Sequence, residues 1–314
     1  MAKPRPLPFP DVPKTVEAEI PSPPVAPVDT DQMAFLRKAL NAPSLVEVKD
    51  LITKEILEYN MLNKIELTKD GVTTMLPDEP RHFLFPEVLT TVDACIPAAL
   101  IGPAGSGKST MCEQIAVALG LKYYLQNSVS GDHQLAGYMD AHGRYQTTAF
   151  RDCFEKGGLI LIDEVDTSDA GALKWVNTAL ANGHAMFPDK ADPVRRHADF
   201  RIIIAANTFG NGADRMYVGA NQLDASTLDR FVFFDFRYDE KLETVLSGNA
   251  AWAKRVQNLR HAAGKEKARI VISPRASIMG AKLLAKGWKQ DVVEERLIWK
   301  GIDDELKTRI KKAA

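Results

Sequence analysis

The residues with the clearest chemical potential lie in one short segment that starts at Gly102. It reads Gly-Pro-Ala-Gly-Ser-Gly-Lys-Ser, which matches the pattern G-x-x-x-x-G-K-[ST]. In such a loop the glycines let consecutive backbone N–H groups face a phosphate, Lys108 reaches the outer phosphates, and the Ser109 hydroxyl binds Mg²⁺. We therefore predict a site for Mg-ATP formed by this segment: Gly102, Pro103, Ala104, Gly105, Ser106, Gly107, Lys108, Ser109 and Thr110.

Two adjacent acids, Asp163 and Glu164, follow four apolar residues in the run Gly-Leu-Ile-Leu-Ile-Asp-Glu. A buried strand would bring both carboxylates to the edge of a sheet, beside the phosphate-binding loop. Adjacent carboxylates repel each other, and a nearby cation is a physical reason to place them together. We predict that Asp163 holds Mg²⁺ with Ser109 and that Glu164 orients or deprotonates the attacking water. A strand ending in a solvated acidic loop is the alternative.

Asn207 and Arg275 are further catalytic candidates. Asn207 follows the apolar run 202–206, and its amide could hydrogen-bond the terminal phosphate or the attacking water; an Asn that caps a turn is the alternative. Arg275 follows Pro274, and proline is favoured at the first position of a helix. A helix starting there would aim Arg275 back toward the nucleotide, whereas a solvated basic residue is the other interpretation.

Arg230 lies in the segment Leu-Asp-Arg-Phe that precedes the last apolar run. An arginine there could enter the site of a neighbouring subunit and stabilise the charge that develops on the transferring phosphoryl group. Arg215 is a second candidate for this role. The alternative is a surface arginine paired with an acid such as Asp229.

These residues need a sheet to position them. From residue 98 onward, short apolar runs alternate with helix-like segments, which predicts a parallel sheet covered on both faces. The phosphate-binding segment follows one run and opens a helix over 110–119, so a chance match in a glycine-rich turn is disfavoured. We predict an α/β fold with a doubly wound parallel sheet over residues 81–239 and a helical lid over 240–314. The expected strands are 98–101, 123–125, 159–162, 202–206 and 231–236.

The outer parts of the chain have a different composition. Residues 1–30 hold 9 of the 18 prolines, which predicts a disordered arm. Residues 31–80 are predicted to be a helical region, with helices opening at Asp31 and Ser44 and a turn at Asp70-Gly71. Within the lid, six apolar residues are expected to form the core: Trp252, Leu259, Leu283, Leu284, Trp288 and Leu297.

The net charge of −1 hides an asymmetry along the chain. Residues 241–314 carry 17 Lys and Arg against 8 Asp and Glu, a net charge of +9, and the rest is acidic. The basic part could contact nucleic acid, but docking on the acidic body of a second copy is the favoured interpretation.

Three cysteines without a C-x-x-C motif fit a reducing cytoplasm rather than a disulfide or zinc framework. No segment approaches the roughly 18 apolar residues of a membrane span, so we expect a cytoplasmic protein without membrane contact.

Taken in order, these motifs resemble those of AAA+ ATPases. The segments GPAGSGKST, LILIDEVD, IIIAANT, LDRF and ISPRASI are most similar to the MoxR-type, dynein-related group, which includes the cobaltochelatase subunit CobS and the rubisco activase CbbQ. The resemblance implies that Lys108 and Ser109 belong to Walker A, and Asp163 and Glu164 to Walker B. It also implies the following roles: sensor 1 for Asn207, arginine finger for Arg230 and sensor 2 for Arg275.

The same resemblance implies a hexameric ring of identical subunits, and a partner that carries a von Willebrand factor A domain. It implies a hairpin over 131–146 and a second hairpin, before Asn207, over 183–200; ordinary surface hairpins are the alternative. The residues of the first hairpin expected to face the ring pore are Tyr138, Met139, His142, Arg144 and Tyr145. No adenine-binding motif precedes the phosphate-binding segment, so the preference for adenine over guanine comes from the family alone.

Three functions fit these observations. The first is a MoxR/CobS-like ATPase that remodels or activates a protein partner, as a chaperone or a chelatase motor does. The second is an ATPase motor stimulated by nucleic acid, of the restriction or packaging type. The third is a scaffold that binds ATP without much turnover, which the complete set of hydrolytic residues disfavours.

Overall fold

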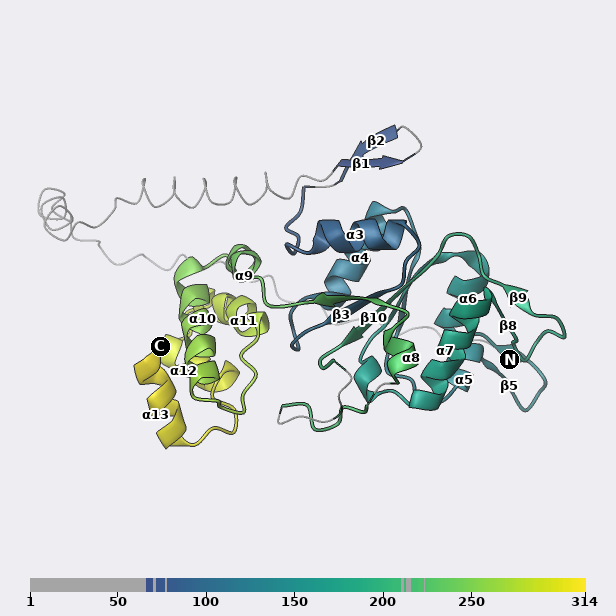
Figure 1. The fold of residues 1–314 in the computed structure, drawn as a ribbon. Coiled ribbons are helices and arrows are strands. Elements are labelled where there is room, and N and C mark those ends of the chain that lie inside the picture. The colour runs from purple at the N-terminus through teal and green to yellow at the C-terminus, as the bar shows by residue number, and fades with distance from the viewer. Residues whose placement is uncertain (1–65, 70–71, 77, 210–211, 213–215, 223) are drawn as a thin grey trace, which may run out of the picture. The chain divides into compact units, whose positions relative to one another are not determined.

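A computed structural model describes residues 66–69, 72–76, 78–209, 212, 216–222 and 224–314 of the chain (Figure 1). The predicted arm over 1–30, the helices expected over 31–64, the turn at Asp70-Gly71 and the alternative finger Arg215 lie outside these residues. Within the region predicted to be helical, Glu66–Lys69 (β1) and Val72–Met75 (β2) pair as antiparallel strands. The threonines and valine of these segments favour strand over helix.

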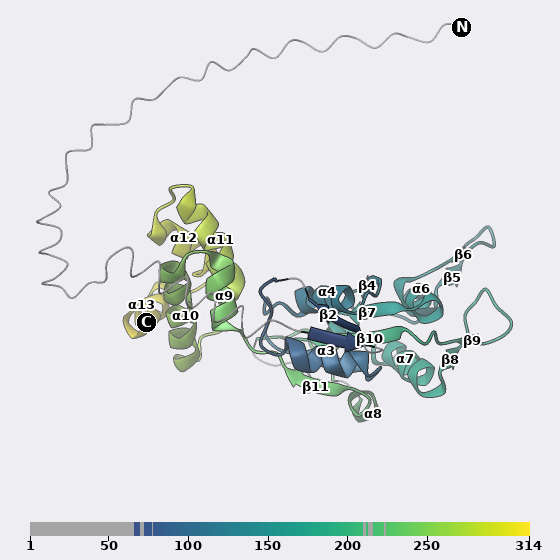
Figure 2. The same cartoon turned by 90° about the horizontal axis from the view of Figure 1, so that it is seen from above.

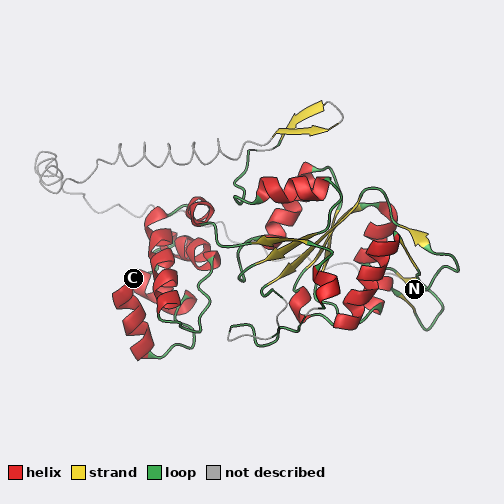
Figure 3. Ribbon diagram, in the orientation of Figure 1, coloured by secondary structure: helices red, strands yellow, loops and turns green. Residues whose placement is uncertain are grey.

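The centre of the fold is a five-stranded parallel sheet (Figure 3). Its strand order is β11-β3-β10-β7-β4, and every neighbouring pair is parallel. All five apolar runs of the sequence therefore form strands, as predicted. The strand bounds are β3 (Ala98–Ile101), β4 (Tyr123–Gln126), β7 (Gly158–Ile162), β10 (Phe200–Ala206) and β11 (Val232–Asp235).

Helices cover both faces of this sheet, and this explains why its strands lack an alternating pattern. Along β7, Leu159 and Leu161 enter one core and Ile160 and Ile162 enter the other. The first core is shared with α3 and α4 and the second with α6 and α7. The α/β doubly wound fold is thus confirmed. The helix bounds are α3 (Phe85–Asp93), α4 (Lys108–Ala118), α6 (Ala149–Lys156) and α7 (Ala170–Asn182).

The carboxyl ends of the central strands set the place of the site. Ligands of open parallel sheets bind beyond these ends, where the strand order changes direction. In the sheet register Ile101 of β3 lies beside Ala206 of β10, and Ile162 of β7 lies beside Ile204. The phosphate loop, the two acids and Asn207 follow these residues directly, so the fold brings them to one edge.

Two small hairpins extend from the end of the sheet where α6 and α7 lie (Figures 1 and 2). The first pairs β5 (Tyr138–Met139) with β6 (Tyr145–Gln146), after the short helix α5 (His133–Ala136). The second pairs β8 (His184–Ala185) with β9 (Val194–Arg195). Both predicted segments thus contain a hairpin, and the position of the first one in a ring pore stays a prediction.

Residues 240–314, here called the lid, are all described and contain no strand. Their helices are α9 (Glu240–Ser247), α10 (Ala250–Lys265), α11 (Pro274–Ala285), α12 (Gln290–Leu297) and α13 (Asp304–Ala313). Trp252 and Leu259 are buried in a lid core as predicted, but the prediction for Trp288 is wrong because it is 45% exposed. It follows the turn at Gly287, and Trp299 is buried in the core instead. No helix in the described ranges has the length and apolar character to cross a membrane.

Candidate nucleotide-binding site

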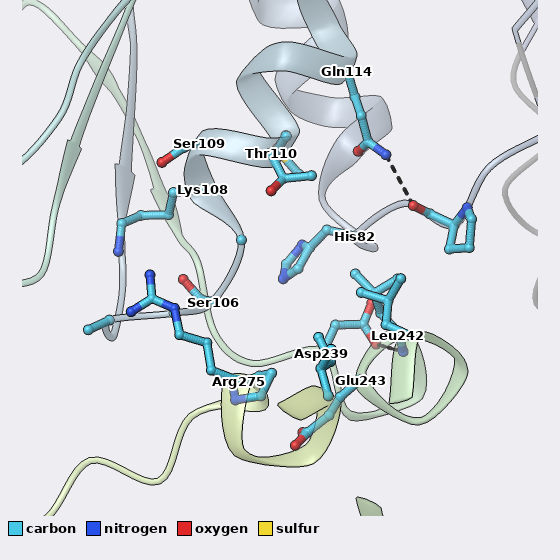
Figure 4. A pocket seen from close by; sticks show the side chains of 18 of the residues that line it. His82, Ser106, Lys108, Ser109, Thr110, Gln114, Asp239, Leu242, Glu243 and Arg275 are labelled. Carbon is cyan, nitrogen blue, oxygen red and sulfur yellow. Dashed lines mark hydrogen bonds between the residues drawn. The ribbon is translucent and has the colours of Figure 1, made fainter. Parts of the chain in front are cut away.

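A cavity of about 580 Å³ opens between the phosphate loop and the lid helices α9 and α11 (Figure 4). Gly102, Pro103 and Arg230 are predicted site residues that do not line it. The other predicted residues line it together: Ala104, Gly105, Ser106, Gly107, Lys108, Ser109, Thr110, Asp163, Glu164, Asn207 and Arg275.

The phosphate loop has the backbone of an anion cradle. Gly105 and Gly107 have φ values of +77° and +100°, in the left-handed region that favours glycine. α4 begins at Lys108, and no side chain caps its first turn, so its first N–H groups remain for an anion. The Ser106 hydroxyl is buried and has no hydrogen-bond partner among the described residues. A phosphate oxygen would satisfy these donors.

Lys108 is 7% exposed and donates hydrogen bonds to three neutral oxygens. Its Nζ lies 2.7 Å from the carbonyl oxygen of Gly102, 3.3 Å from that of Pro103 and 3.1 Å from Oδ1 of Asn207. Burial lowers the pKa of Lys108, and the nearby Arg275 lowers it further, whereas the surrounding acids raise it. Gly102 and Pro103 thus contact the lysine rather than the cavity.

Arg275 reaches the same end of the cavity from α11. Its side chain points toward Lys108 and Ser106 (Figure 4), and no carboxylate of the described residues forms an ion pair with it. Two cations that face one cavity repel each other unless an anion lies between them. The arrangement therefore fits a polyphosphate.

The predicted magnesium ligands lie side by side. Ser109 Oγ donates to Oδ2 of Asp163 at 3.0 Å, and the other oxygen of Asp163 accepts from the Glu164 N–H at 2.9 Å. In the described ranges, no group of three or more His, Cys, Asp or Glu side chains could hold a metal ion. One hydroxyl and one carboxylate fit Mg²⁺, which usually completes its octahedron with water and substrate phosphates.

Glu164 occupies an unusual backbone conformation. Its φ and ψ are 53° and 41°, the left-handed region that non-glycine residues rarely adopt. The side chain is exposed and lines the cavity. Such conformations cost of order 1–3 kcal/mol and gather at functional sites. Glu164 thus combines an uncommon backbone conformation with a place in the lining of the cavity.

A third acid, Asp166, holds Asn207 in place, and sequence reasoning missed it. Asp166 lies in the 3₁₀ helix η1 (Val165–Thr167) and is 1% exposed. Its Oδ2 accepts from the N–H of Asn207 at 3.0 Å, and from the N–H and hydroxyl of Thr208 at 3.1 and 3.2 Å. Because the main chain is fixed in this way, the Asn207 side chain stays beside Lys108. The only sequence signal was the third acid in Asp-Glu-Val-Asp.

The opposite end of the cavity has an apolar lining that suits a nucleobase. Gln114 Nε2 donates to the Pro80 carbonyl oxygen at 3.1 Å, which ties the segment before α3 to α4 (Figure 4). No motif in the sequence pointed to this end, because its residues come from distant segments. They include Pro80, His82, Met111, Leu242, Leu246 and Ile278.

His82 is a buried residue in the lining of this cavity. Its Nε2 lies 2.8 Å from the carbonyl oxygen of Arg237, and its Nδ1 accepts from the Leu84 N–H at 3.2 Å, so the neutral ring carries its proton on Nε2. The ring stacks on Phe236 with centroids 4.0 Å apart. Burial lowers the pKa of His82, although the Arg237 carbonyl and Asp239 oppose this.

The lowered pKa of His82 makes a prediction about acid stability. As the pH falls, His82 of the unfolded chain binds a proton near its ordinary pKa of 6.5, whereas His82 of the folded chain binds it only at a lower pH. The free energy of unfolding should therefore fall as the pH drops below about 6.5 and through the folded-state pKa. Urea unfolding between pH 7.5 and 5.5 should show a shallower loss for His82→Gln, which keeps a donor for Arg237. Equal slopes would contradict this prediction, since the other histidines are common to both proteins.

Arg230 lies away from this cavity. It is exposed, and its guanidinium donates to the carbonyl oxygen of Ser226, one turn earlier in the chain. Ser226 belongs to the short helix α8 (Ala225–Leu228), directly before β11. The ion pair with Asp229, which was the alternative interpretation, is not formed among the described residues. Arg230 is therefore available to a neighbouring molecule.

The parallel sheet, the phosphate loop and the C-terminal helices define an α/β P-loop NTPase fold. Residues 97–231 match the family model "AAA domain (dynein-related subfamily)". This segment contains the phosphate loop, Asp163, Glu164, Asn207 and Arg230. The match and the site geometry together support an AAA+ ATPase, a class that binds and hydrolyses ATP.

Two proteins illustrate the similarity. Midasin of Dictyostelium discoideum is 27% identical over 164 residues, which cover 49% of this chain and 3% of midasin. The crystal structure of NtrX from Brucella abortus matches with a TM-score of 0.44 and 16% identity, over 88% of this chain and 60% of that one. The chain thus spans only a small part of the length of midasin.

Proposed function

We propose that this protein hydrolyses Mg-ATP as a subunit of a ring and uses the energy to remodel or activate a protein partner, in the manner of MoxR/CobS-like ATPases. One observation carries the proposal. Side chains from separate elements of the sheet domain and from the lid converge on one cavity: Lys108, Ser109, Asp163, Glu164, Asn207 and Arg275. A binding-only scaffold would have no use for an exposed carboxylate at the position of Glu164.

Each residue has a defined task in this proposal. Lys108 exchanges the carbonyl oxygens of Gly102 and Pro103 for phosphate oxygens, and Arg275 neutralises charge from the lid side. Ser109 and Asp163 would hold Mg²⁺, which supplies further charge neutralisation when bound. Glu164 takes the proton of the attacking water or orients that water. Asn207 keeps Oδ1 on Lys108, which leaves its amide N–H groups for an oxygen of the water or phosphate.

The proposed ring depends on Arg230. An exposed arginine outside its own cavity can supply charge to the site of the next subunit, as arginine fingers do. Such a finger contributes a factor of about 10³–10⁵ to kcat in related phosphoryl transfers. A ring is therefore the assembly in which this site would be complete.

Subunit mixing tests the finger. We expect Arg230→Ala and Glu164→Gln each to lose at least about 99% of ATPase activity, and a mixture to regain part of it, because some interfaces then combine an intact Glu164 with an intact Arg230. Steady-state phosphate release at several mixing ratios measures this. As a control, Glu164→Gln is mixed with Arg195→Ala, which changes an exposed arginine of the second hairpin. The ATPase activity of this mixture should be the average of the activities of its two components. Absence of rescue at every ratio would count against a shared site.

The nature of the partner can be tested by stimulation of ATP turnover. We expect a protein with a von Willebrand factor A domain to raise kcat several-fold, with a weak dependence on salt. The basic lid favours nucleic acid as the second candidate, since residues 241–314 carry a net charge of +9. However, several of its cations pair with lid acids, such as Arg255 with Glu294 and Arg309 with Glu305. Stimulation by duplex DNA with a steep salt dependence would replace the first function by the second.

A further inference from the structure

The phosphate loop is held at one residue, Ala104, by two tyrosines from different parts of the chain. The Tyr217 hydroxyl accepts a hydrogen bond from the Ala104 N–H at 3.1 Å. The Tyr238 hydroxyl donates to the Ala104 carbonyl oxygen at 2.9 Å. Neither tyrosine lines the cavity, so both contact the loop from outside it. Burial raises the pKa of Tyr238 to about 12, so its hydroxyl remains a donor at neutral pH.

Tyr238 belongs to the four-residue connection 236–239 between the sheet and the lid. β11 ends at Asp235 and α9 begins at Glu240. On one side of Tyr238, the carbonyl oxygen of Arg237 is bound by His82. On the other side, Asp239 caps α9 by accepting from the Leu242 N–H at 2.9 Å. The main chain is thus fixed before and after Tyr238, and its side chain contacts the phosphate loop.

The ring of Tyr238 contacts the lid, while its hydroxyl contacts Ala104 of the phosphate loop. The Arg260 guanidinium of α10 lies over the ring, 4.5 Å from its centroid. Arg260 also donates to both carboxylate oxygens of Glu243 in α9, at 2.9 and 2.6 Å. The Glu243 side chain is 0% exposed and accepts from Ser277 Oγ of α11 at 2.5 Å. A buried bidentate pair is costly to separate, so these three lid helices should move together with Tyr238.

α11 makes a second contact with the loop. A Cβ atom added to Gly105 would lie 2.9 Å from the side chain of Ser273 and 3.4 Å from Nε of Arg275. Ser273 precedes Ser277 by about one helical turn. The lid residues at Gly105 and the tyrosine at Ala104 are therefore connected through the same buried group of side chains.

We propose that Tyr238 is a positioning residue that couples the phosphate-loop peptide at Ala104 to the lid through Arg260 and Glu243, and so places Arg275. Lys108 is bound to the carbonyl oxygens of Gly102 and Pro103, directly before Ala104. When Lys108 binds phosphate oxygens instead, the carbonyl oxygens of Gly102 and Pro103 lose their hydrogen bonds to Nζ. The peptide at Ala104 can then shift, and Tyr238, which is bound to it, moves the lid with it. The consequence for turnover rests on the proposed function, whereas the coupling itself does not.

Three single-hydroxyl variants test the coupling in the full chain without nucleotide. Tyr238→Phe keeps the ring under Arg260 and removes only the bond to Ala104. Tyr217→Phe removes the other hydroxyl at Ala104. Tyr123→Phe is the control, because the Tyr123 hydroxyl is buried and has no hydrogen-bond partner among the described residues.

Amide hydrogen exchange is the measurement. Tyr238→Phe should speed exchange about two- to tenfold in both the phosphate loop and α9, which is the factor expected for one lost hydrogen bond. Tyr217→Phe should act on the loop alone, and Tyr123→Phe on neither. A Tyr238→Phe protein with altered exchange in the loop only, or in neither region, would overturn the coupling. Thermal unfolding checks that all variants fold.

Steady-state ATP hydrolysis then tests the consequence for the site. Tyr238→Phe should lower kcat about five- to tenfold and change KM by less than about twofold, because binding remains and placement of Arg275 suffers. Arg260→Lys keeps the charge beside Glu243 but has no planar group over Tyr238. It should likewise lower kcat with little change in KM, and it replaces Tyr238→Phe as the test if that variant folds poorly. A rise in KM at unchanged kcat would overturn the role. Absence of ATPase activity in the unaltered protein would instead refute the proposed function, and the exchange results would still decide the coupling.

Discussion

Glu164→Gln is expected to bind ATP with an affinity within about threefold of the unaltered protein and to lose at least about 99% of its turnover. The carboxylate is exposed, lines the cavity and has only one acid beside it in the sequence, Asp163, whose oxygens already bind Ser109 and the Glu164 N–H. The amide of Gln has the same size but cannot accept a proton. Loss of a general base typically costs a factor of 10²–10⁴.

Single-turnover phosphate release and equilibrium ATP binding together check this prediction. Glu113→Gln is a matched control, because Glu113 is an exposed acid of α4 that does not line the cavity. It should retain normal kcat and KM. Normal turnover in Glu164→Gln would remove Glu164 from the mechanism, and weak ATP binding would point to a role in the ground state instead.

Lys108→Ala is expected to abolish measurable ATP binding at micromolar nucleotide, a loss of at least about 100-fold. The substitution removes the buried ammonium that lies among Asn207 and the loop carbonyls. It also removes a cation that offsets the charge of Asp163 and Glu164, so a polyphosphate would meet more repulsion from these carboxylates. Hydrogen bonds to charged groups contribute about 1.5–3 kcal/mol each, and several are lost together.

Isothermal titration with ATP and with ADP measures the affinity. Lys122→Ala is the control, because Lys122 is exposed and lies over the ring of Tyr124, away from the cavity. Its nucleotide affinity should be unchanged. Thermal unfolding should show that Lys108→Ala remains folded, since the two apolar cores that hold the sheet and its helices do not include Lys108. Near-normal ATP affinity in Lys108→Ala would contradict the assignment of the phosphate loop.

Much of the candidate site could be predicted because its residues belong to continuous motifs. Each motif follows a short apolar strand, and parallel strands bring their carboxyl ends to one edge. The sequence alone was therefore enough to bring Lys108, Asp163 and Asn207 together. Arg275 needed one more step, the proline that marks the start of α11.

Other site residues could not be predicted, because their roles depend on tertiary contacts. His82 and Tyr238 lie in ordinary sequence surroundings, and only the folded chain brings them to the connection between sheet and lid. Trp288 was placed in the lid core by its apolar character, but the turn at Gly287 leaves it exposed. The strands β1 and β2 fall in a region that was predicted to be helical, since their four-residue segments are too short for a period to emerge.

The separate core of the lid has a mechanical consequence. Its buried apolar side chains, among them Trp252, Leu259 and Trp299, come from the lid alone and pack against one another. A rotation about the connection 236–239 would therefore expose none of them to water, and its energetic cost would come from the contacts that the lid makes at that connection, at Gly105 and along the cavity. The lid can thus rotate as one rigid body. A small displacement of the lid residues beside the phosphate loop would then move the lid residues far from the connection, such as those of α13, by a larger distance.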